Sequence, residues 1–351
     1  MKIIHCADVH LGSPLNHISD RQKIENRKQE VRTTFKNVVE YAKEVGASVV
    51  MLSGDVFDSN RPFKKDKEFF YSVVKNNPDI DFLYLRGNHD REEGFEEEYQ
   101  NLKTFSNEWS CYEYGQVKIY GLEITNDNYV SMYNTFSARS SDFNIVMLHG
   151  QTSDTTQKDL ININKLKDKN IDYLALGHVH SYSEVKLDDR GVYVYCGCPE
   201  GRGFDETGKK GIVLLTLENG DCKSEFVPMA IRETFLIKVD CTGLKDAFEI
   251  YSRIKEIAKT PKKDMLRVEL FGEVDFDTEG LEEEISSLLH DYSYLNSIKD
   301  RTVRRFDVSG IEDDLSIKGE FIKKVLSSDL DDESKKRVVS LGLKALNGRE
   351  L

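Results

Sequence analysis

Short runs of apolar residues alternate with polar stretches along the first 230 residues of the chain. Each run is four to six residues long and rich in β-branched and aromatic residues, which predicts buried strands. The eight predicted strands are Ile3–Ala7, Ser48–Ser53, Phe82–Leu85, Val117–Leu122, Asn144–Leu148, Tyr173–Leu176, Val192–Cys196 and Ile212–Leu217.

Two of the intervening polar stretches carry a helical pattern. Over residues 24–42 apolar residues recur at spacings of three and four, which predicts a helix with one buried stripe. Ser19 or Asp20 can cap its start, and Gly46 ends it. A second helix is predicted over Lys64–Lys75. Strands that alternate with helices predict an α/β fold built in layers, with a largely buried sheet.

The pattern changes after Pro228. A new series of strands and helices begins there, and its βαβαβ order predicts a small α+β domain over residues 231–308 that follows a domain of residues 1–230. The predicted elements are the strands Phe235–Val239, Leu266–Phe271 and Thr302–Val308 and the helices Leu244–Ala258 and Leu281–Leu289.

The last part of the chain, residues 309–351, predicts a helical hairpin. Its two amphipathic helices are expected over Leu315–Leu326 and Glu333–Leu346. Such a hairpin is too small to be stable alone. It either packs on the body of the protein, which is the commoner outcome, or offers its apolar face to a partner. The apolar faces contain Ile317, Phe321 and Val325 on the first helix and Val338, Leu341 and Ala345 on the second.

Polar motifs follow directly after five of the predicted strands. In open α/β sheets, ligands bind outside the carboxyl ends of the strands, so we expect these motifs to meet at one edge. In chain order they are Asp8-Val9-His10, Gly54-Asp55, Gly87-Asn88-His89-Asp90, His149-Gly150 and Gly177-His178-Val179-His180. Each motif alone is weak and has an ordinary explanation as a turn or a solvated side chain. The five together favour a functional site.

The residue types in these motifs point to metal binding. Imidazole and carboxylate are good ligands for Mn, Fe or Zn, and no thiolate is involved. Two carboxylates and four imidazoles exceed the three or four protein ligands that one catalytic zinc takes. Two metal ions that share a bridging carboxylate would use the whole set. His5, His17 and His290 match no motif, and we expect no role for them in the site.

Charge and composition narrow the function classes. The net charge of −13 argues against a self-sufficient nucleic-acid binder, because DNA affinity rests largely on phosphate neutralisation. No apolar stretch approaches the ~20 residues that span a bilayer. The N-terminal residues do not predict a signal peptide. The six cysteines form no pair of CxxC motifs, so we expect a reduced, cytoplasmic protein without a membrane partner.

The order of motifs D-x-H, G-D, G-N-H-D, H-G and G-H-x-H resembles the calcineurin-like metallophosphoesterase superfamily over roughly residues 1–228. Within it, Gly54-Asp55-Val56-Phe57-Asp58 and Ala7-Asp8-Val9-His10-Leu11-Gly12 are similar to the SbcD branch of DNA double-strand-break repair nucleases. Pro199-Glu200-Gly201-Arg202, followed by Glu206-Thr207-Gly208-Lys209-Lys210-Gly211, is most similar to the YhaO type of repair exonuclease.

The resemblance implies a role for each matching residue. Two divalent metal ions are expected, Mn ahead of Fe, Zn or Mg. His89 would be the catalytic group over the scissile phosphate rather than a ligand. Asp58 stands where some relatives carry His, so its role is left open. The implied ligands are Asp8, His10, Asp55 and His180 for one metal and Asp55, Asn88, His149 and His178 for the other, with Asp55 as the bridge.

The resemblance also implies an architecture and partners. The expected fold is a four-layer sandwich of two β-sheets flanked by helices, with the α+β domain as a cap that contacts DNA. The terminal hairpin would bind an SbcC-like coiled-coil ABC ATPase. Related nucleases are often dimers. Arg61 and Arg202 are candidate contacts to the DNA backbone, although mixed charges surround both.

Two other functions are kept as alternatives to a DNA nuclease. The acidic balance favours a small-molecule phosphodiesterase or phosphatase with the same metals. A scaffold that has lost catalysis is disfavoured, because such scaffolds lack ligands or the catalytic histidine, and here all seven predicted ligands and His89 are present. If the metals import the positive field that cleavage needs, the charge of −13 predicts a subunit that relies on its partner to hold DNA.

Overall fold

The computed structural model describes residues 1–90, 99–158, 160–218, 220–304 and 315–346. It divides into two compact units, Met1–Glu233 and Thr234–Leu351. Each unit is described by itself. Among the described residues, no helix combines the length and the apolar character needed to cross a bilayer.

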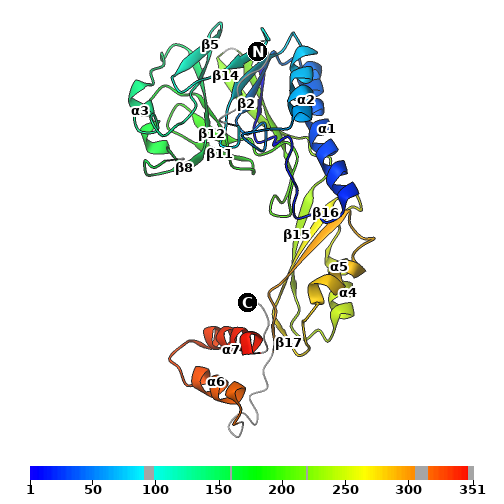
Figure 1. The fold of residues 1–351 in the computed structure, drawn as a ribbon. Helices are drawn as coiled ribbons and strands as arrows, with labels where there is room; N and C mark the ends of the chain where they lie inside the picture. The colour runs from blue at the N-terminus through cyan, green and yellow to red at the C-terminus, as the bar shows by residue number, and fades with distance from the viewer. Residues whose placement is uncertain (91–98, 159, 219, 305–314, 347–351) are drawn as a thin grey trace. The chain divides into compact units, whose positions relative to one another are not determined.

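Two six-stranded sheets form the first unit (Figure 1). The first sheet contains β1 (Lys2–Cys6), β2 (Val49–Ser53), β3 (Asp81–Leu85), β4 (Leu102–Thr104), β13 (Gly211–Glu218) and β14 (Asp221–Pro228). The second contains β5 (Ser110–Tyr114), β6 (Val117–Gly121), β7 (Phe143–His149), β10 (Tyr173–Gly177), β11 (Ser183–Lys186) and β12 (Val192–Tyr195). Their orders are β14-β13-β1-β2-β3-β4 and β11-β12-β10-β7-β6-β5.

Three apolar clusters build the layers. Helices α1 (Arg21–Val45) and α2 (Lys64–Lys75) cover one face of the first sheet. The two sheets pack face to face on a second cluster, and the outer face of the second sheet packs against α3 (Met132–Thr135) and the segment from β9 (Leu160–Asn162) through the short 3₁₀ helix η1 (Ile163–Lys165). The short strand β8 (Gln151–Ser153) pairs with β9. The predicted four-layer α/β sandwich is confirmed.

Helix α1 begins and ends where its sequence predicts. The Asp20 side chain accepts hydrogen bonds from the backbone N–H groups of Gln22 and Lys23, which would otherwise lack partners. Gly46 follows the helix with a left-handed backbone, φ 72°, which glycine adopts without steric cost. The stripe from Val31 to Ala42 is buried against the sheet.

The second unit is built on a parallel three-stranded sheet, β15-β16-β18, with two helices packed on it. Its elements are β15 (Thr234–Asp240), α4 (Ala247–Ile257), β16 (Met265–Phe271), β17 (Glu273–Val274), α5 (Leu281–Leu288), β18 (Leu295–Asp300) and β19 (Val303–Arg304). Helix α4 begins later than predicted, because the Asp246 side chain caps it by accepting from the Glu249 N–H. The third strand of the sheet is β18, which we did not predict, since only Ile298 in it is buried.

The predicted strand Thr302–Val308 is seen only as β19, and residues 305–308 lie outside the described part of the chain. The hairpin consists of α6 (Ile317–Leu326) and α7 (Asp332–Leu346). Its apolar cluster is small: Ile322, Val325 and Val339 are buried, and Phe321 packs beside them. The subdivision of residues 231–351 into a cap domain and a separate hairpin stays a prediction.

Candidate metal centre

Motif residues from both sheets lie at one edge of the sandwich. Strands β1, β2 and β3 run parallel to one another, as do β7 and β10 in the facing sheet, so their carboxyl ends can converge. Asp8 and His10 follow β1, Asp55 follows β2, Asn88 and His89 follow β3, His149 ends β7, and His178 and His180 follow β10. Every motif identified from the sequence reaches this edge.

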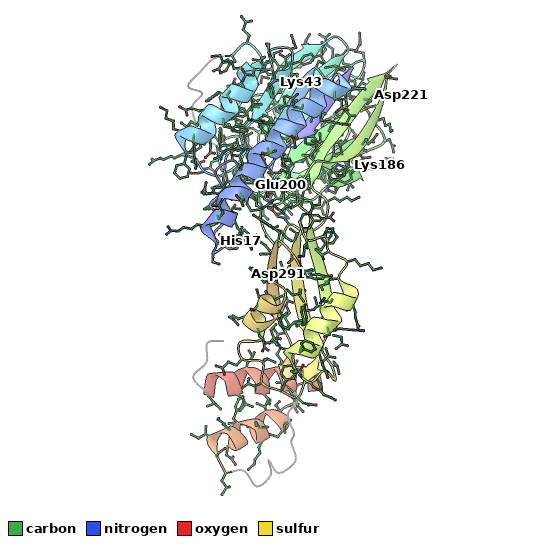
Figure 2. The ribbon with its side chains drawn as sticks, turned by 90° about the vertical axis from the view of Figure 1, so that its right-hand side faces the viewer. His17, Lys43, Lys186, Glu200, Asp221 and Asp291 are labelled. Carbon is green, nitrogen blue, oxygen red and sulfur yellow. The ribbon has the colours of Figure 1, made fainter. Side chains whose placement is uncertain are left out.

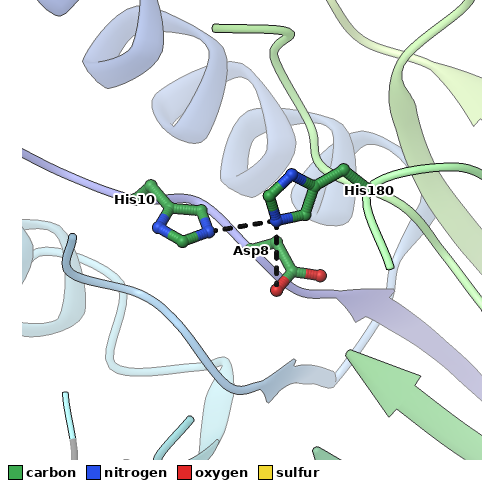
Figure 3. A group of neighbouring side chains, drawn as sticks. All are labelled: Asp8, His10 and His180. Atoms are coloured by element: carbon green, nitrogen blue, oxygen red, sulfur yellow. Dashed lines mark hydrogen bonds and ion pairs between the residues drawn. The ribbon is translucent and has the colours of Figure 1, made fainter. Parts of the chain in front are cut away.

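One group of donor atoms joins Asp8, His10 and His180, shown in Figure 3. The Nε2 atoms of the two histidines are 3.2 Å apart, and His180 Nε2 is 3.9 Å from Asp8 Oδ1. Their ligand atoms all lie within 4.8 Å of one another. Two imidazoles and a carboxylate at this spacing can hold one divalent ion.

A second group joins Asp8, Asp55 and His149. Oδ2 of Asp55 is 3.3 Å from His149 Nε2 and 3.8 Å from His10 Nε2, so this carboxylate faces a histidine of each group. Asp8 is a member of both groups. The position of Asp55 fits the bridging role that the sequence predicts.

Asn88 and His178 lie beside the second group. Asn88 Nδ2 is 3.5 Å from His178 Nδ1, and the ring centroids of His178 and His149 are 5.4 Å apart. The His178 backbone N–H donates to both Asp8 oxygens at 3.0 and 2.9 Å. His178 belongs to neither of the two groups of donor atoms above. The roles of Asn88 and His178 as ligands stay predictions.

His89 is exposed and differs in this from His10 and His149, which are buried. Its backbone N–H donates to Asp55 Oδ1 at 2.9 Å, and its ring Nδ1 is 3.2 Å from the carbonyl oxygen of Asp58. The ring centroid is 5.1 Å from that of His10. A histidine fixed at Nδ1 beside a metal site has its other nitrogen, Nε2, available for a substrate.

The backbone at the site is strained. Among the described residues, seven other than glycine have a left-handed backbone, and four of these are predicted ligands. Their φ angles are 54° at Asp8, 49° at His10, 52° at Asp55 and 100° at His178. Such conformations cost of order 1–3 kcal/mol each and persist only where the surrounding structure fixes them. Strain of this kind is typical of functional sites.

The motif glycines allow the strand ends to approach one another. A Cβ atom on Gly87 would lie 2.1 Å from Asp55 Oδ1, and one on Gly54 would lie 2.0 Å from His149 Nδ1. The buried Asp90 carboxylate fixes the same loops by accepting from the backbone N–H groups of Gly87 and Val56. The Tyr84 hydroxyl donates to it as well. The sequence predicts no role for Asp90, because an acid that supports neighbouring loops has no sequence signature of its own.

Burial and charge pairing decide the protonation of the metal-free site. Burial raises the pKa of Asp8 to about 6, and burial lowers the pKa of His10 to about 4. Burial alone would lower the pKa of His149, but the neighbouring Asp55 carboxylate, 3.3 Å away, outweighs it and raises the pKa to about 9. The neighbouring His149 opposes the effect of burial on Asp55 and holds the pKa of Asp55 well below its usual range.

The surroundings of His149 fit a bound metal ion. His149 Nε2 is buried and has no hydrogen-bond partner of suitable direction, although Asp55 lies near it. Its other nitrogen, Nδ1, donates to the Ser53 carbonyl at 2.9 Å, so Nε2 can give its lone pair to a cation that displaces its proton. A buried nitrogen without a partner is costly unless a cation completes it.

Arg202 and Arg61, the predicted DNA contacts, differ in their surroundings. The Arg202 guanidinium is largely buried and pairs with Asp58 at 2.7 Å and with Glu206 at 3.0 Å. Arg61 is exposed, and among the described residues its side chain makes no hydrogen bond or ion pair. Glu206 accepts from His180 Nδ1 at 2.6 Å. The sequence indicated Glu206 only as part of a motif.

Comparison with known proteins places this site in a family. The profile of the calcineurin-like phosphoesterases matches residues 1–182, which is more than half of the chain. The chain therefore belongs to the calcineurin-like phosphoesterase family and is a metal-dependent phosphoesterase. Metal dependence follows from both the family and the donor set.

Two curated relatives indicate which members of the family this chain is similar to. The DNA double-strand break repair protein Mre11 of Sulfolobus acidocaldarius is 26% identical over 297 residues, 78% of this chain and 76% of that protein. The uncharacterized metallophosphoesterase YhaO of Bacillus subtilis is 29% identical over 246 residues, 64% of this chain and 60% of YhaO. The predicted similarity to DNA double-strand break repair proteins and to YhaO is thereby confirmed.

A solved structure, a dimetal phosphatase from Danio rerio, matches with a TM-score of 0.40 and 10% identity. The match covers 62% of this chain and 93% of that one.

Proposed function

We propose that this chain is the manganese-dependent nuclease subunit of a DNA repair complex and cleaves phosphodiester bonds of the DNA backbone. The observation that carries the proposal is that the two donor groups share Asp8 and that Asp55 Oδ2 lies 3.3 Å from His149 Nε2 and 3.8 Å from His10 Nε2. His89 is exposed beside them. Imidazole and carboxylate without thiolate suit Mn, Fe or Zn, and Mn is the ion that we propose.

In the proposed site Asp8, His10, Asp55 and His180 hold one metal. The other is held by Asp55, Asn88, His149 and His178. When bound, the two ions would supply charge to neutralise the phosphoryl oxygens and would lower the pKa of bound water. Up to four positive charges then face the two ligand carboxylates, which gives an acidic chain a local positive field for phosphate.

His89 is the proposed general acid. Its Nδ1 lies within hydrogen-bond distance of the Asp58 carbonyl, which favours a proton on Nδ1 and leaves Nε2 available for the substrate. The ring then gives the proton on Nε2 to the departing sugar oxygen. The backbone hydrogen bond from His89 to Asp55 fixes its distance from the metals.

Similarity beyond the first unit supports DNA as the substrate. The Mre11 relative matches 78% of the chain, whereas the first unit makes up about two thirds of it, so the match includes part of the second unit. A small-molecule phosphodiesterase has no need for this unit. The net charge of −13 is the one observation that favours that alternative.

The hairpin α6–α7 is the proposed docking surface for an SbcC-like coiled-coil ABC ATPase. Its core buries three residues, while Leu315, Ile317 and Leu341 are exposed. Exposed apolar side chains on so small an element favour a partner that covers them. Because the chain is acidic, the ATPase would supply much of the affinity for DNA.

The direct test is a degradation assay. Labelled duplex and single-stranded DNA are incubated with Mn²⁺ and the protein, with and without an SbcC-like coiled-coil ATPase from the same organism. Chelator-treated protein is the control, and a small nucleotide phosphodiester is assayed in parallel. Manganese-dependent loss of DNA supports the proposal. Rapid turnover of the nucleotide with intact DNA in both conditions would refute it in favour of the small-molecule enzyme.

A further inference from the structure

Both histidines of the first donor group have a carboxylate at Nδ1, on the side away from the donor group. His180 Nδ1 is 2.6 Å from Glu206 Oε1. His10 Nδ1 is 2.9 Å from Asp58 Oδ1, an ion-pair distance with a direction short of a linear hydrogen bond. The Nε2 atoms of these two histidines face each other, 3.2 Å apart. Each ring therefore stands between a carboxylate and the site.

One arginine joins the two carboxylates. Arg202 donates from one terminal nitrogen to Asp58 Oδ1 at 2.7 Å and from the other to Glu206 Oε1 at 3.0 Å. The backbone N–H of Arg202 also donates to the second oxygen of Glu206. The three side chains are at most 15% exposed, so solvent screens their charges little.

We propose that Asp58, Arg202 and Glu206 form a positioning trio that orients His10 and His180 for one of the two metal ions. The inference rests on the ligand set of the proposed function. A carboxylate at Nδ1 fixes the proton there, presents the Nε2 lone pair and makes the imidazole a better ligand. The forked guanidinium sets the distance between the two carboxylates, which lysine cannot do with a single ammonium.

The second donor group is built differently. His149 Nδ1 donates to the Ser53 carbonyl, a backbone acceptor within the core, and no part of the trio contacts this ring among the described residues. Loss of the trio should therefore weaken one metal position and leave the other intact. A residue that merely stabilised the fold would not make this distinction.

The test measures metal affinity rather than turnover. Chelator-treated wild type is titrated with Mn²⁺ by calorimetry, and two equivalents are expected. Glu206→Ala, Asp58→Ala and Arg202→Met should each lower the affinity for one equivalent about 10–100-fold. Glu206→Gln keeps an oxygen that can accept from His180 and should restore much of that loss. Arg202→Lys should restore little.

The matched control is Arg190→Met. Arg190 makes a bidentate pair with Asp172, which precedes β10, whereas the site follows the end of that strand. This variant should bind both equivalents as the wild type does. In the zinc-loaded protein, NMR of ¹⁵N-labelled histidine should show two Nδ1–H signals that shift with Glu206→Ala or Asp58→Ala and not with Arg190→Met.

Three results would overturn the inference. Unchanged affinity for both equivalents in the three trio variants would remove the positioning role but leave the two-metal proposal standing. Equal weakening of both equivalents, with a lower melting temperature in chelator, would make the trio a support of the fold. Fewer than two equivalents in the wild type would refute the proposed ligand set itself.

Discussion

The two units of this protein differ in which residues they bury and which they expose. Of the buried polar residues among the described part of the chain, nineteen lie in the first unit and four in the second. Of the exposed large hydrophobic residues, four lie in the first unit and twelve in the second, although the second is half as long. The first unit buries charge, and the second exposes apolar surface.

We interpret this contrast as a sign of two kinds of function. Buried charges are expensive unless they are paired or bind metal, so a unit that keeps many of them is organised around chemistry. Exposed apolar side chains carry no catalytic group, but they become favourable when a partner covers them. We therefore expect substitutions in the first unit to change catalysis and stability, and substitutions in the second to change association.

The largest expected effect is on catalysis. His89→Ala should lower the rate of bis-p-nitrophenyl phosphate hydrolysis in Mn²⁺ by about 10²–10⁴-fold, because the leaving oxygen loses its proton donor. Manganese content and melting temperature should stay at the wild-type values. His290→Ala, a histidine of the second unit without a motif, is the control. Activity close to that of the wild type in His89→Ala would contradict the assigned role.

The second effect is on the stability of the first unit. Glu200, labelled in Figure 2, is buried beside α1, where it pairs with Arg27 and accepts from Thr34. Glu200→Ala should lower the free energy of unfolding by about 3 kcal/mol, because the buried arginine keeps only part of its pairing.

Urea unfolding measures this difference. Glu40→Ala, which breaks an exposed pair with Lys43 in the same helix, should change stability little and serves as the control. Equal effects of the two variants would mean that buried charge has no special weight in this unit.

The third effect is on association. Ile317→Glu and Leu341→Glu place charges on exposed apolar positions of the hairpin. Each should weaken binding of the coiled-coil ATPase by more than about tenfold, since a charge must then be desolvated at the interface. The free protein should melt as the wild type does.

Calorimetric titration with the ATPase gives the affinity. Val130→Glu, at an exposed apolar position of the first unit, is the matched control and should bind normally. If Val130→Glu were as damaging as Ile317→Glu, the division of labour between the units would be wrong.

The last expected effect, the smallest when taken per pH unit, is a pH dependence of stability. Burial lowers the pKa of His5, which contacts the Tyr173 hydroxyl at 2.9 Å, to about 3. Between that value and the ordinary 6.5, the unfolded chain binds more protons than the folded one. Stability is therefore complete above about pH 6.5 and should fall on acidification by up to about 1.4 kcal/mol per pH unit.

Urea unfolding of chelator-treated protein at several pH values tests this prediction. In His5→Gln the slope between pH 6.5 and 4 should be shallower than in the wild type. The comparison removes the contribution of other titrating groups, because they are common to both proteins. Identical slopes would show that His5 is not the source.

The strands show which elements of the fold can be predicted from sequence patterns. In the two six-stranded sheets the sequence predicts all eight interior strands to within one residue at either end, but none of the four edge strands, β4, β5, β11 and β14. Interior strands are buried on both faces and read as continuous apolar runs. Edge strands are half exposed, so their polar residues hide the pattern. The strand β18 was missed for the same reason.

The sequence by itself determined the fold class, the family and the motif residues that meet at the sheet edge. Local patterns of burial, together with histidine, aspartate and glycine at strand ends, are sufficient for this, because parallel strands deliver their ends to one place. Only the tertiary structure decided which atoms face one another: that Asp55 lies between His149 and His10, and that Arg202 joins Asp58 to Glu206. Such contacts connect residues up to 170 positions apart. Their geometry depends on how two sheets pack, which no local pattern encodes.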